Sequence, residues 1–366
     1  MKTDSHDRLP PINQCLVSFG SNLGDRHRLI ADAAALLSQS AVVADSSLDA
    51  NFRASRLFQT PPIGGPGGQE PFLNAVAAFD TRASAREVLL LLQHLETELG
   101  RQRKRRWDAR SIDLDVVLHG QLVGGGTGLI VPHPRYTARQ FVLQPACDVA
   151  AEFRDPRFGW TLQRLAEHLN AGVPSIALVG GDLETRAELC RLLQENHGMQ
   201  TFAARPLPPP MAVVGNTPAA ILREGNRSGN GEQPLHVDRP AVFDQDTASP
   251  KGPSQQGSNG DWFETGEPII SIGDQPWVSA YLPKLPSLQS QYTTLETVPR
   301  LVARMHRTTA ETQWPAPHQM WPAGWRWPEY RLEIDDLVWA ASELASAMQS
   351  MRCDVTPVTA DGQWWC

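Results

Sequence analysis

The sequence of 366 residues has few cysteines, no long apolar run and no excess of positive charge. Its five cysteines are odd in number and form no C-x-x-C pair, which argues against a disulfide framework or a zinc site and favours reduced thiols in a cytoplasm. No apolar stretch approaches the roughly 20 residues that span a bilayer, and we expect no secretion signal. The formal net charge of −7 argues against general binding to nucleic acids or membrane surfaces.

The length suggests two domains, because soluble domains average roughly 150 residues. The character of the sequence changes after Gly172, so we predict one domain over residues 1–172 and a second over 173–366. A stretch around 224–262 is rich in Gly, Ser, Asn, Gln and Pro, which is typical of a disordered insertion.

The first domain is predicted to follow the order β-α-β-β-α-β. Strands are expected over residues 15–20, 52–59, 72–79 and 112–118. Apolar residues at helical spacing predict one helix over 26–38 and another that begins at Ser84, with Glu87 as its capping-box partner, and ends at Gly100. This order is that of the ferredoxin-like α+β fold.

Asp113 and Asp115 form a D-x-D pair on the last of these strands. Side chains alternate along a strand, so both carboxylates point to one face, while Leu114 and Val116 face the core. Such a pair suits Mg²⁺, which takes one or two carboxylates together with phosphate oxygens and water. A lone D-x-D is more often a solvated strand face, so the neighbouring residues decide between the two interpretations.

A dense basic run precedes the aspartates. Its members are Arg101, Arg103, Lys104, Arg105, Arg106 and Arg110. Alone, such a run is more often a solvated surface or a nucleic-acid patch, and nucleic-acid binding is one hypothesis for residues 101–110. It conflicts with the acidic total. Guanidinium groups grip phosphate oxygens in pairs, so cations next to a carboxylate pair indicate a nucleoside triphosphate with Mg²⁺.

Two further segments suit a flat polar heterocycle. A stiff loop consists of Thr60, Pro61, Pro62 and Ile63. Phe72 and Asn74 share a face of one strand, where a stacking ring and an amide with donor and acceptor suit a pterin edge. Each also has an ordinary interpretation: Phe72 as a core residue, Asn74 as a turn former and His133 as part of a simple loop.

Five motifs follow one another between residues 15 and 170. They are SFGSNLGD (18–25), TPPIG (60–64), FLNAV (72–76), GRQRKRRWDARSIDLDVVLHG (100–120) and VPHPRYTARQFVLQP (131–145). This part of the chain closely resembles the 6-hydroxymethyl-7,8-dihydropterin pyrophosphokinase family of folate biosynthesis. It departs from the family at Asp108-Ala109, where a Gly-Pro pair is usual, which bears on the rigidity of the basic loop.

The resemblance implies transfer of pyrophosphate from ATP to the pterin hydroxymethyl group, giving the pterin diphosphate and AMP. It assigns two Mg²⁺ ions to Asp113 and Asp115, which form the expected catalytic set with Arg103 and Arg110. The implied pterin pocket consists of Thr60, Pro61, Pro62, Ile63, Phe72, Asn74 and Phe141, with the ring between the two phenylalanines. The implied ATP contacts are Gln93, Glu96, Arg101, Arg103, Lys104, Arg106, Trp107, Arg110, His133 and Arg139, and the loop that carries residues 103–107 is implied to close over the substrates.

The second half gives weaker indications. Residues 176–189 faintly resemble the strand-loop-helix of a nucleoside or thymidylate kinase, but the pattern G-x-x-x-x-G-K-[ST] is missing and Asp182 and Glu184 would repel phosphate. We therefore predict an α/β domain without an intact phosphate loop, with a helix over 334–351 and a structural or protein-binding role. The tryptophans Trp314, Trp321, Trp325 and Trp327 are candidates for a partner surface or for a core.

Two functions remain in competition for the first domain. One is an active pyrophosphokinase. The other is a catalytically idle fold that binds ATP or pterin and acts as a scaffold for another folate enzyme. The D-x-D pair together with Asn74 and His133 favours the enzyme, since an idle protein has no reason to keep them all.

Overall fold

The computed structural model describes residues 10–44, 52–65, 67–101, 109–126, 128–202, 265–266, 274–283, 298–307 and 327–366. All of them belong to one compact unit. The insertion predicted around 224–262 lies outside these ranges, as do residues 102–108 of the basic run. None of the helices in the described part of the chain has the length and apolar character needed to cross a bilayer.

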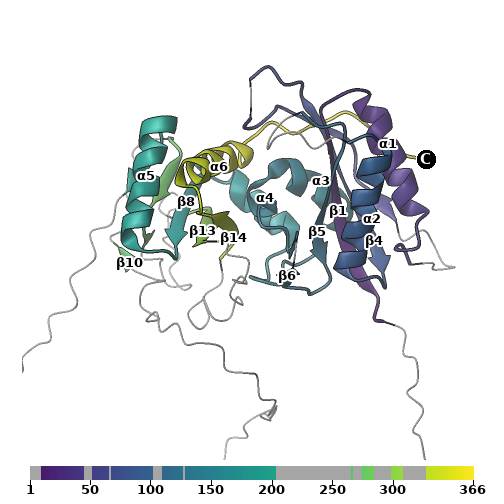
Figure 1. Ribbon diagram of the computed structural model, residues 1–366, viewed down its shortest axis with the longest axis horizontal. Helices are drawn as coiled ribbons and strands as arrows, with labels where there is room; N and C mark the ends of the chain where they lie inside the picture. The colour runs from purple at the N-terminus through teal and green to yellow at the C-terminus, as the bar shows by residue number, and fades with distance from the viewer. Residues whose placement is uncertain are drawn as a thin grey trace, which may run out of the picture. The chain divides into compact units, whose positions relative to one another are not determined.

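The first part of the chain is a mixed α/β structure built on an antiparallel sheet (Figure 1). Its strands are β1 (Asn13–Ser21), β2 (Arg53–Ala54), β3 (Phe58–Thr60), β4 (Phe72–Thr81) and β5 (Asp113–His119). Strand β1 pairs with β4 on one side and β5 on the other, and β2 and β3 pair with the far side of β4. The elements follow the predicted order, except that the single strand expected over 52–59 is divided into β2 and β3.

Two helices, α1 (Arg26–Ser38) and α2 (Ala85–Glu98), begin where the sequence predicts. The Asp25 side chain caps α1 by accepting a hydrogen bond from the Arg28 amide, and Ser84 and Glu87 form the expected capping box at α2. Both helices cover one face of the sheet, while α3 (Gln140–Ala150) and α4 (Leu162–Asn170) lie on the other side (Figure 1).

A second sheet follows residue 172 and is entirely parallel. Its strands are β8 (Ser175–Val179), β9 (Gln200–Phe202), β11 (Trp277–Ser279), β13 (Leu301–His306) and β14 (Glu329–Glu333), in the order β14-β13-β8-β11-β9. Helix α6 (Leu337–Ser350) lies within the stretch 334–351 where a helix is predicted, and α5 (Leu183–His197) begins within the segment 176–189 that resembles a strand-loop-helix. The remaining elements are β6 (Gly124–Gly126), β7 (Leu129–Val131), the 3-10 helix η1 (Tyr136–Ala138), β10 (Thr265–Gly266), β12 (Leu282–Pro283) and β15 (Thr356–Pro357).

The loop before α5 has a structural task of its own. Asp182 caps this helix, because its carboxylate accepts a hydrogen bond of 2.6 Å from the Thr185 amide. Gly180 and Gly181 turn the chain with positive φ angles of 77° and 64°. Asp182, which was expected to repel phosphate, thus serves as the N-terminal cap of α5.

The two sheets share one hydrophobic core. Leu143 of α3, Leu178 of β8 and Leu344 of α6 are fully buried members of it. Trp327 also packs against this core, with its ring edge-on to Trp160 at a centroid distance of 5.3 Å. The other three tryptophans of the predicted cluster lie outside the described residues. The domain boundary near residue 172 stays a prediction, and residues on both sides of it build this core.

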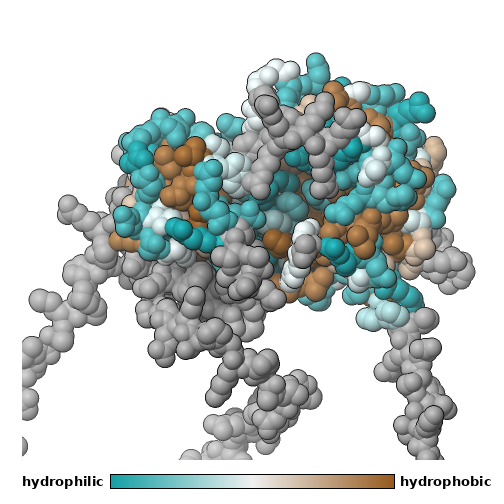
Figure 2. Space-filling model, in the orientation of Figure 1, coloured by the Kyte–Doolittle hydropathy of each residue, from teal (hydrophilic) through white to brown (hydrophobic). Residues whose placement is uncertain are grey.

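Exposed apolar side chains are scattered over the described surface. Leu36 lies on α1, Leu90 on α2 and Val338 on α6, each at least two-fifths exposed. On the face that Figure 2 shows, the hydrophobic areas are correspondingly interrupted by hydrophilic ones. Scattered apolar residues of this kind are normal on a protein surface.

The last residues described add an edge strand to the antiparallel sheet. Strand β15 pairs with β3 in antiparallel orientation, and the Val358 amide donates to the Leu57 carbonyl at 2.8 Å. Further along, the Trp364 indole donates to the Ser55 carbonyl at 2.6 Å, and the Trp365 ring meets Phe52 edge-on at 4.9 Å. This tail covers an edge that would otherwise expose unpaired backbone groups.

Replacing Gly362 with alanine is expected to loosen this tail. A Cβ atom at Gly362 would overlap the Ala54 carbonyl oxygen, so the two backbones would have to separate. Overpacking of this kind costs about 1–3 kcal/mol, which urea unfolding of the variant would measure. Gly126→Ala is the matched control, since its Cβ atom would meet nothing within 4 Å. Equal loss of stability in both variants would contradict the contact.

Candidate active site

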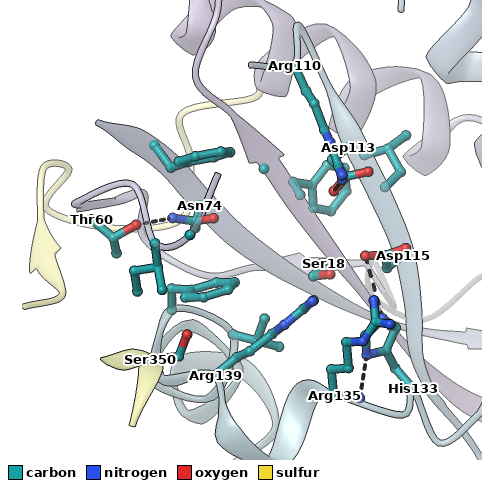
Figure 3. A pocket seen from close by; sticks show the side chains of 18 of the residues that line it. Ser18, Thr60, Asn74, Arg110, Asp113, Asp115, His133, Arg135, Arg139 and Ser350 are labelled. Carbon is teal, nitrogen blue, oxygen red and sulfur yellow. Dashed lines mark hydrogen bonds and ion pairs between the residues drawn. The ribbon is translucent and has the colours of Figure 1, made fainter. Parts of the chain in front are cut away.

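A cavity of about 630 Å³ opens on the face of the antiparallel sheet that α3 partly covers. Strand pairing sets its floor: Asn74 of β4, Gly20 of β1 and Asp113 of β5 lie opposite one another, and Ser18 pairs with Asp115 in the next row. A side chain at Gly20 would begin 3.4 Å from the Asn74 amide oxygen, so glycine keeps the floor low between the amide and the carboxylate. Figure 3 shows Asn74, Asp113, Ser18 and Asp115 around the cavity.

The position of the cavity follows from the sequence of β1. Leu16, Ser18 and Gly20 share one face of this strand because side chains alternate. Leu16 is buried in the core beneath α3, whereas Ser18 and Gly20 line the cavity. The change from a large apolar residue to small ones marks where the core ends and the cavity begins.

One end of the cavity is lined by the residues predicted to bind a heterocycle. The Asn74 amide nitrogen donates to the Thr60 hydroxyl at 2.8 Å, and both residues are at most 5% exposed. Phe72 and Phe141 line the same cavity. The hydrogen bond fixes the Asn74 amide, so its oxygen and second N–H are held ready to meet the edge of a flat ligand.

The other end carries the two aspartates. Arg101 contacts Asp113 through an Nη1 to Oδ1 distance of 2.8 Å, and Arg110 pairs with the other oxygen of the same carboxylate. The Asp115 side chain is 39% exposed and lies 3.8 Å from the His133 Nε2 atom. Among the residues that the structure describes, no three His, Cys, Asp or Glu side chains gather as a metal cluster. At this end of the cavity, Asp113 and Asp115 present carboxylate oxygens of the kind that Mg²⁺ prefers.

Glu96 fixes this end of the cavity from α2. Its Oε1 atom accepts a hydrogen bond of 2.9 Å from the Leu114 amide and pairs with Arg101. Burial raises the pKa of the Glu96 carboxyl, which the Leu114 amide and Arg101 partly offset. Glu96 thus holds both the strand of the aspartates and the first arginine of the basic run. Gln93, three residues earlier, also lines the cavity, as the helical spacing predicts.

Asn22 explains why the motif SFGSNLGD lies beside the basic run. Its amide donates to the Arg110 carbonyl at 3.1 Å, and its side-chain oxygen accepts from the Arg110 amide at 2.8 Å. The side-chain nitrogen donates to Gln69 at 3.0 Å, and Asn22 is 1% exposed. This pair of backbone contacts fixes Arg110 where it enters the cavity, a role that the sequence reading did not assign.

His133, Arg135 and Arg139 form a basic wall. The His133 Nδ1 atom accepts a hydrogen bond of 3.2 Å from the Arg135 amide, which leaves its proton on Nε2, toward Asp115. Burial, together with Arg139 and Arg135, lowers the pKa of His133 well below its ordinary value, so the ring is neutral at pH 7. Burial and the neighbouring Arg135 also lower the pKa of Arg139. This wall favours an anionic ligand.

The structure brings most of the predicted site residues to this one cavity. They are Thr60, Pro61, Ile63, Phe72, Asn74, Gln93, Glu96, Arg101, Arg110, Asp113, Asp115, His133, Arg139 and Phe141. Pro62 is not among the lining residues. Arg103, Lys104, Arg106 and Trp107 lie outside the described residues.

Several lining residues were missed by the sequence reading. Arg135 lies in the motif VPHPRYTARQFVLQP between two predicted residues, so its place was a usable signal. Tyr330 and Glu343 lie far from the motifs and had none. Only the packing of the second sheet against the first reveals them.

Comparisons with known proteins identify the family of the chain. The family model described as 7,8-dihydro-6-hydroxymethylpterin-pyrophosphokinase (HPPK) matches residues 16–151. The chain is 37% identical over 140 residues to 2-amino-4-hydroxy-6-hydroxymethyldihydropteridine pyrophosphokinase of Bacillus subtilis, covering 38% of this chain and 80% of that protein. This chain belongs to the HPPK family. The protein of the same name from Pseudomonas aeruginosa is 37% identical over 148 residues, which are 40% of this chain and 85% of that protein.

Among solved structures, a Plasmodium falciparum HPPK-DHPS is 9% identical and covers 56% of each chain with a TM-score of 0.34, too distant to support an argument. The span matched by the HPPK family model contains every lining residue from Ser18 to Phe141. Tyr330 and the lining residues of α6 lie outside it. The HPPK motifs thus account for most of the cavity wall, and the rest belongs to the second half of the chain.

Proposed function

We propose that this chain is an active HPPK, 2-amino-4-hydroxy-6-hydroxymethyldihydropteridine diphosphokinase. It transfers pyrophosphate from ATP to 6-hydroxymethyl-7,8-dihydropterin, giving the pterin diphosphate and AMP in tetrahydrofolate biosynthesis. The observation that carries the proposal is the single cavity in which the Asn74 amide, the two aspartates and three arginines (Arg101, Arg110 and Arg139) meet in a chain of this family.

The fold is proposed in two parts. The sheet order β5-β1-β4-β3, with α1 and α2 on one face, supports a ferredoxin-like arrangement for the HPPK part. The parallel sheet around β8 supports an α/β second part, which lacks the Lys and Ser/Thr of a phosphate loop after Gly180-Gly181.

In the proposed site, the pterin occupies the end next to Thr60 and Asn74. The Asn74 amide, held by Thr60, would meet the polar edge of the ring. Phe72 and Phe141 would stack on its two faces. This pose directs the hydroxymethyl group of the pterin toward the aspartates, along the row that joins Asn74 to Asp113 through Gly20.

At the phosphate end of the cavity, we propose that charged side chains that now pair with one another would pair with ATP and its metal. Asp113 and Asp115 would hold Mg²⁺, two ions with ATP, which would supply positive charge to neutralise the phosphates. Arg101 and Arg110 pair with Asp113 in this structure, and a bound triphosphate would offer both guanidinium groups further anionic partners. The neutral His133 would donate a hydrogen bond from its Nε2–H group to the phosphates, and Arg139 would add positive charge.

The chemistry needs alignment more than a strong base. The hydroxymethyl oxygen of the pterin attacks the β-phosphorus of ATP in line with the departing AMP oxygen. Arg101, Arg110 and Arg139 stabilise the negative charge on the phosphates. We also propose that Arg103, Lys104, Arg106 and Trp107, which lie outside the described residues, contact ATP. The described residues on either side support this, because Arg101, Ala109 and Arg110 all line the cavity.

The test is to supply the full chain with ATP, Mg²⁺ and 6-hydroxymethyl-7,8-dihydropterin and to measure AMP and the pterin diphosphate. Product formation that stops when Mg²⁺ is chelated is the expected result. Binding of ATP and pterin without AMP would instead support the idle scaffold.

A further inference from the structure

Helix α6 forms part of the wall of the HPPK cavity, although it lies outside the span matched by the family model. Glu343, Ser346, Ala347 and Ser350 line the cavity. Their spacing of three, four and seven residues places them on one face of the helix. Figure 3 shows Ser350 among the side chains around the cavity. The second half of the chain therefore contributes directly to the site.

The same helix holds Arg135 in place. The Arg135 Nε atom donates to Glu343 Oε1, and the guanidinium carbon lies 5.2 Å from the centroid of the Trp339 ring. Trp339 and Glu343 are four residues apart, so they lie one above the other on α6. The Glu343 carboxylate, 2% exposed, is fixed from a second side by the Tyr330 hydroxyl at 3.0 Å.

This arrangement leaves the terminal nitrogens of Arg135 available. Glu343 engages only the Nε edge, and the two Nη groups have no hydrogen-bond partner among the described residues. Arg135 lines the cavity beside His133 and Arg139, and Figure 3 shows its side chain running toward the side of the cavity that holds Asp115. A guanidinium held by one edge presents the other to phosphate oxygens, which it binds in pairs.

We propose that Glu343 and Trp339 are positioning residues of the HPPK active site: they hold Arg135 so that its terminal nitrogens meet the phosphates of ATP. The proposal rests on the proposed function. Its physical basis is preorganisation, because a long side chain already fixed in its binding conformation loses less freedom when the ligand arrives. In this chain, α6 thus completes the phosphate end of the cavity.

The first test is Glu343→Ala in the full chain. Without its anchor, Arg135 must be ordered by ATP itself, so KM for ATP is expected to rise about tenfold. The value of kcat should stay within about twofold and KM for the pterin should not change. Glu343→Gln keeps an oxygen that accepts the Nε proton, so its KM for ATP is expected to return most of the way to the wild-type value. A KM for ATP unchanged in both variants would overturn the proposal.

A double-mutant cycle separates positioning from direct contact. If Glu343 acts through Arg135, then adding Glu343→Ala to an Arg135→Gln chain should raise KM for ATP no further. Additive effects would overturn the proposal and place Glu343 itself against the substrate. That outcome is a real alternative, because the Glu343 Oε2 atom is buried without a partner among the described residues.

Matched controls guard against a general loss of structure. Asp148→Asn breaks the 2.8 Å ion pair with Arg56, which lies outside the cavity lining, and should leave KM for ATP unchanged. Thermal unfolding of each variant checks the fold. If Glu343→Ala does not fold, Trp339→Leu, expected to raise KM for ATP about threefold, tests the same clamp. A wild-type chain that makes no AMP would refute the proposed function, whereas active variants with unchanged KM refute only the role of α6.

Discussion

Asp115→Ala is expected to lower kcat by about 10³-fold or more, while affinity for the pterin stays within about twofold. The variant removes one of two carboxylates that would hold Mg²⁺, so charge on the transferred phosphates is no longer neutralised. The pterin end does not depend on it, because the Asn74 amide is fixed by Thr60. Single-turnover AMP release and pterin fluorescence titration measure the two quantities.

The fold should survive this change. The Asp115 side chain is 39% exposed, and among the described residues its side chain has a close partner in the neutral His133, at 3.8 Å. Asp32→Ala on α1 is the control, since it removes an exposed carboxylate that pairs with Arg28 in the described part of the chain and lies outside the cavity lining. Full turnover by the Asp115 variant would refute the metal assignment.

Glu329→Gln is expected to lower the free energy of unfolding by about 3–5 kcal/mol. The Glu329 side chain is fully buried and lies 2.9 Å from Arg304, 3.1 Å from Arg331 and 3.7 Å from Arg157. Burial alone would raise the pKa of Glu329, but the three guanidinium groups hold it below its ordinary value, so the group is charged. The variant removes the buried negative charge that Arg304, Arg331 and Arg157 share, although Arg157 still pairs with Asp155. Urea unfolding measures the loss of stability.

The pH dependence of stability gives this prediction a second check. A carboxyl whose pKa is lower in the folded state stabilises the fold above its unfolded pKa and loses that contribution as the pH falls through the folded one. The difference between wild type and variant should therefore be full at pH 7 and shrink in acid. Glu188→Gln is the control, because its pair with Arg191 is 40–50% exposed and solvent screens the interaction. Equal losses in both variants would contradict the buried network.

Local signals in the sequence predicted much of the fold. Asp25 and Ser84 mark helix starts through contacts within one turn, so they can be read without knowing the rest of the molecule. The D-x-D pair is equally local: period-two alternation places Asp113 and Asp115 on one face, and Leu114 is buried on the other. The break between β2 and β3 was missed, because it contains neither Gly nor Pro; there the Ser55 hydroxyl accepts a hydrogen bond from the Val76 amide.

The site was predicted only where the family motifs reach. Resemblance located His133 and Arg139, but it could not locate Glu343, whose contact with Arg135 joins residues 208 positions apart. Such a contact depends on how the parallel sheet and α6 pack, which no periodicity encodes. The separate second domain expected from composition likewise gave no hint that its helix would line the cavity.

The tail that pairs with β3 has a consequence for how the molecule is made. The Leu57 amide bonds to the Thr359 hydroxyl, 302 positions further on, so β3 leaves the ribosome long before its neighbour exists. At typical translation rates of about 5–20 residues per second, that interval lasts about 15–60 s. During this interval, the edge of β3 next to the Thr60 loop is unpaired in the nascent chain. A neighbouring chain on the same polysome can pair with this edge. Chaperone binding during elongation would therefore matter most for β3.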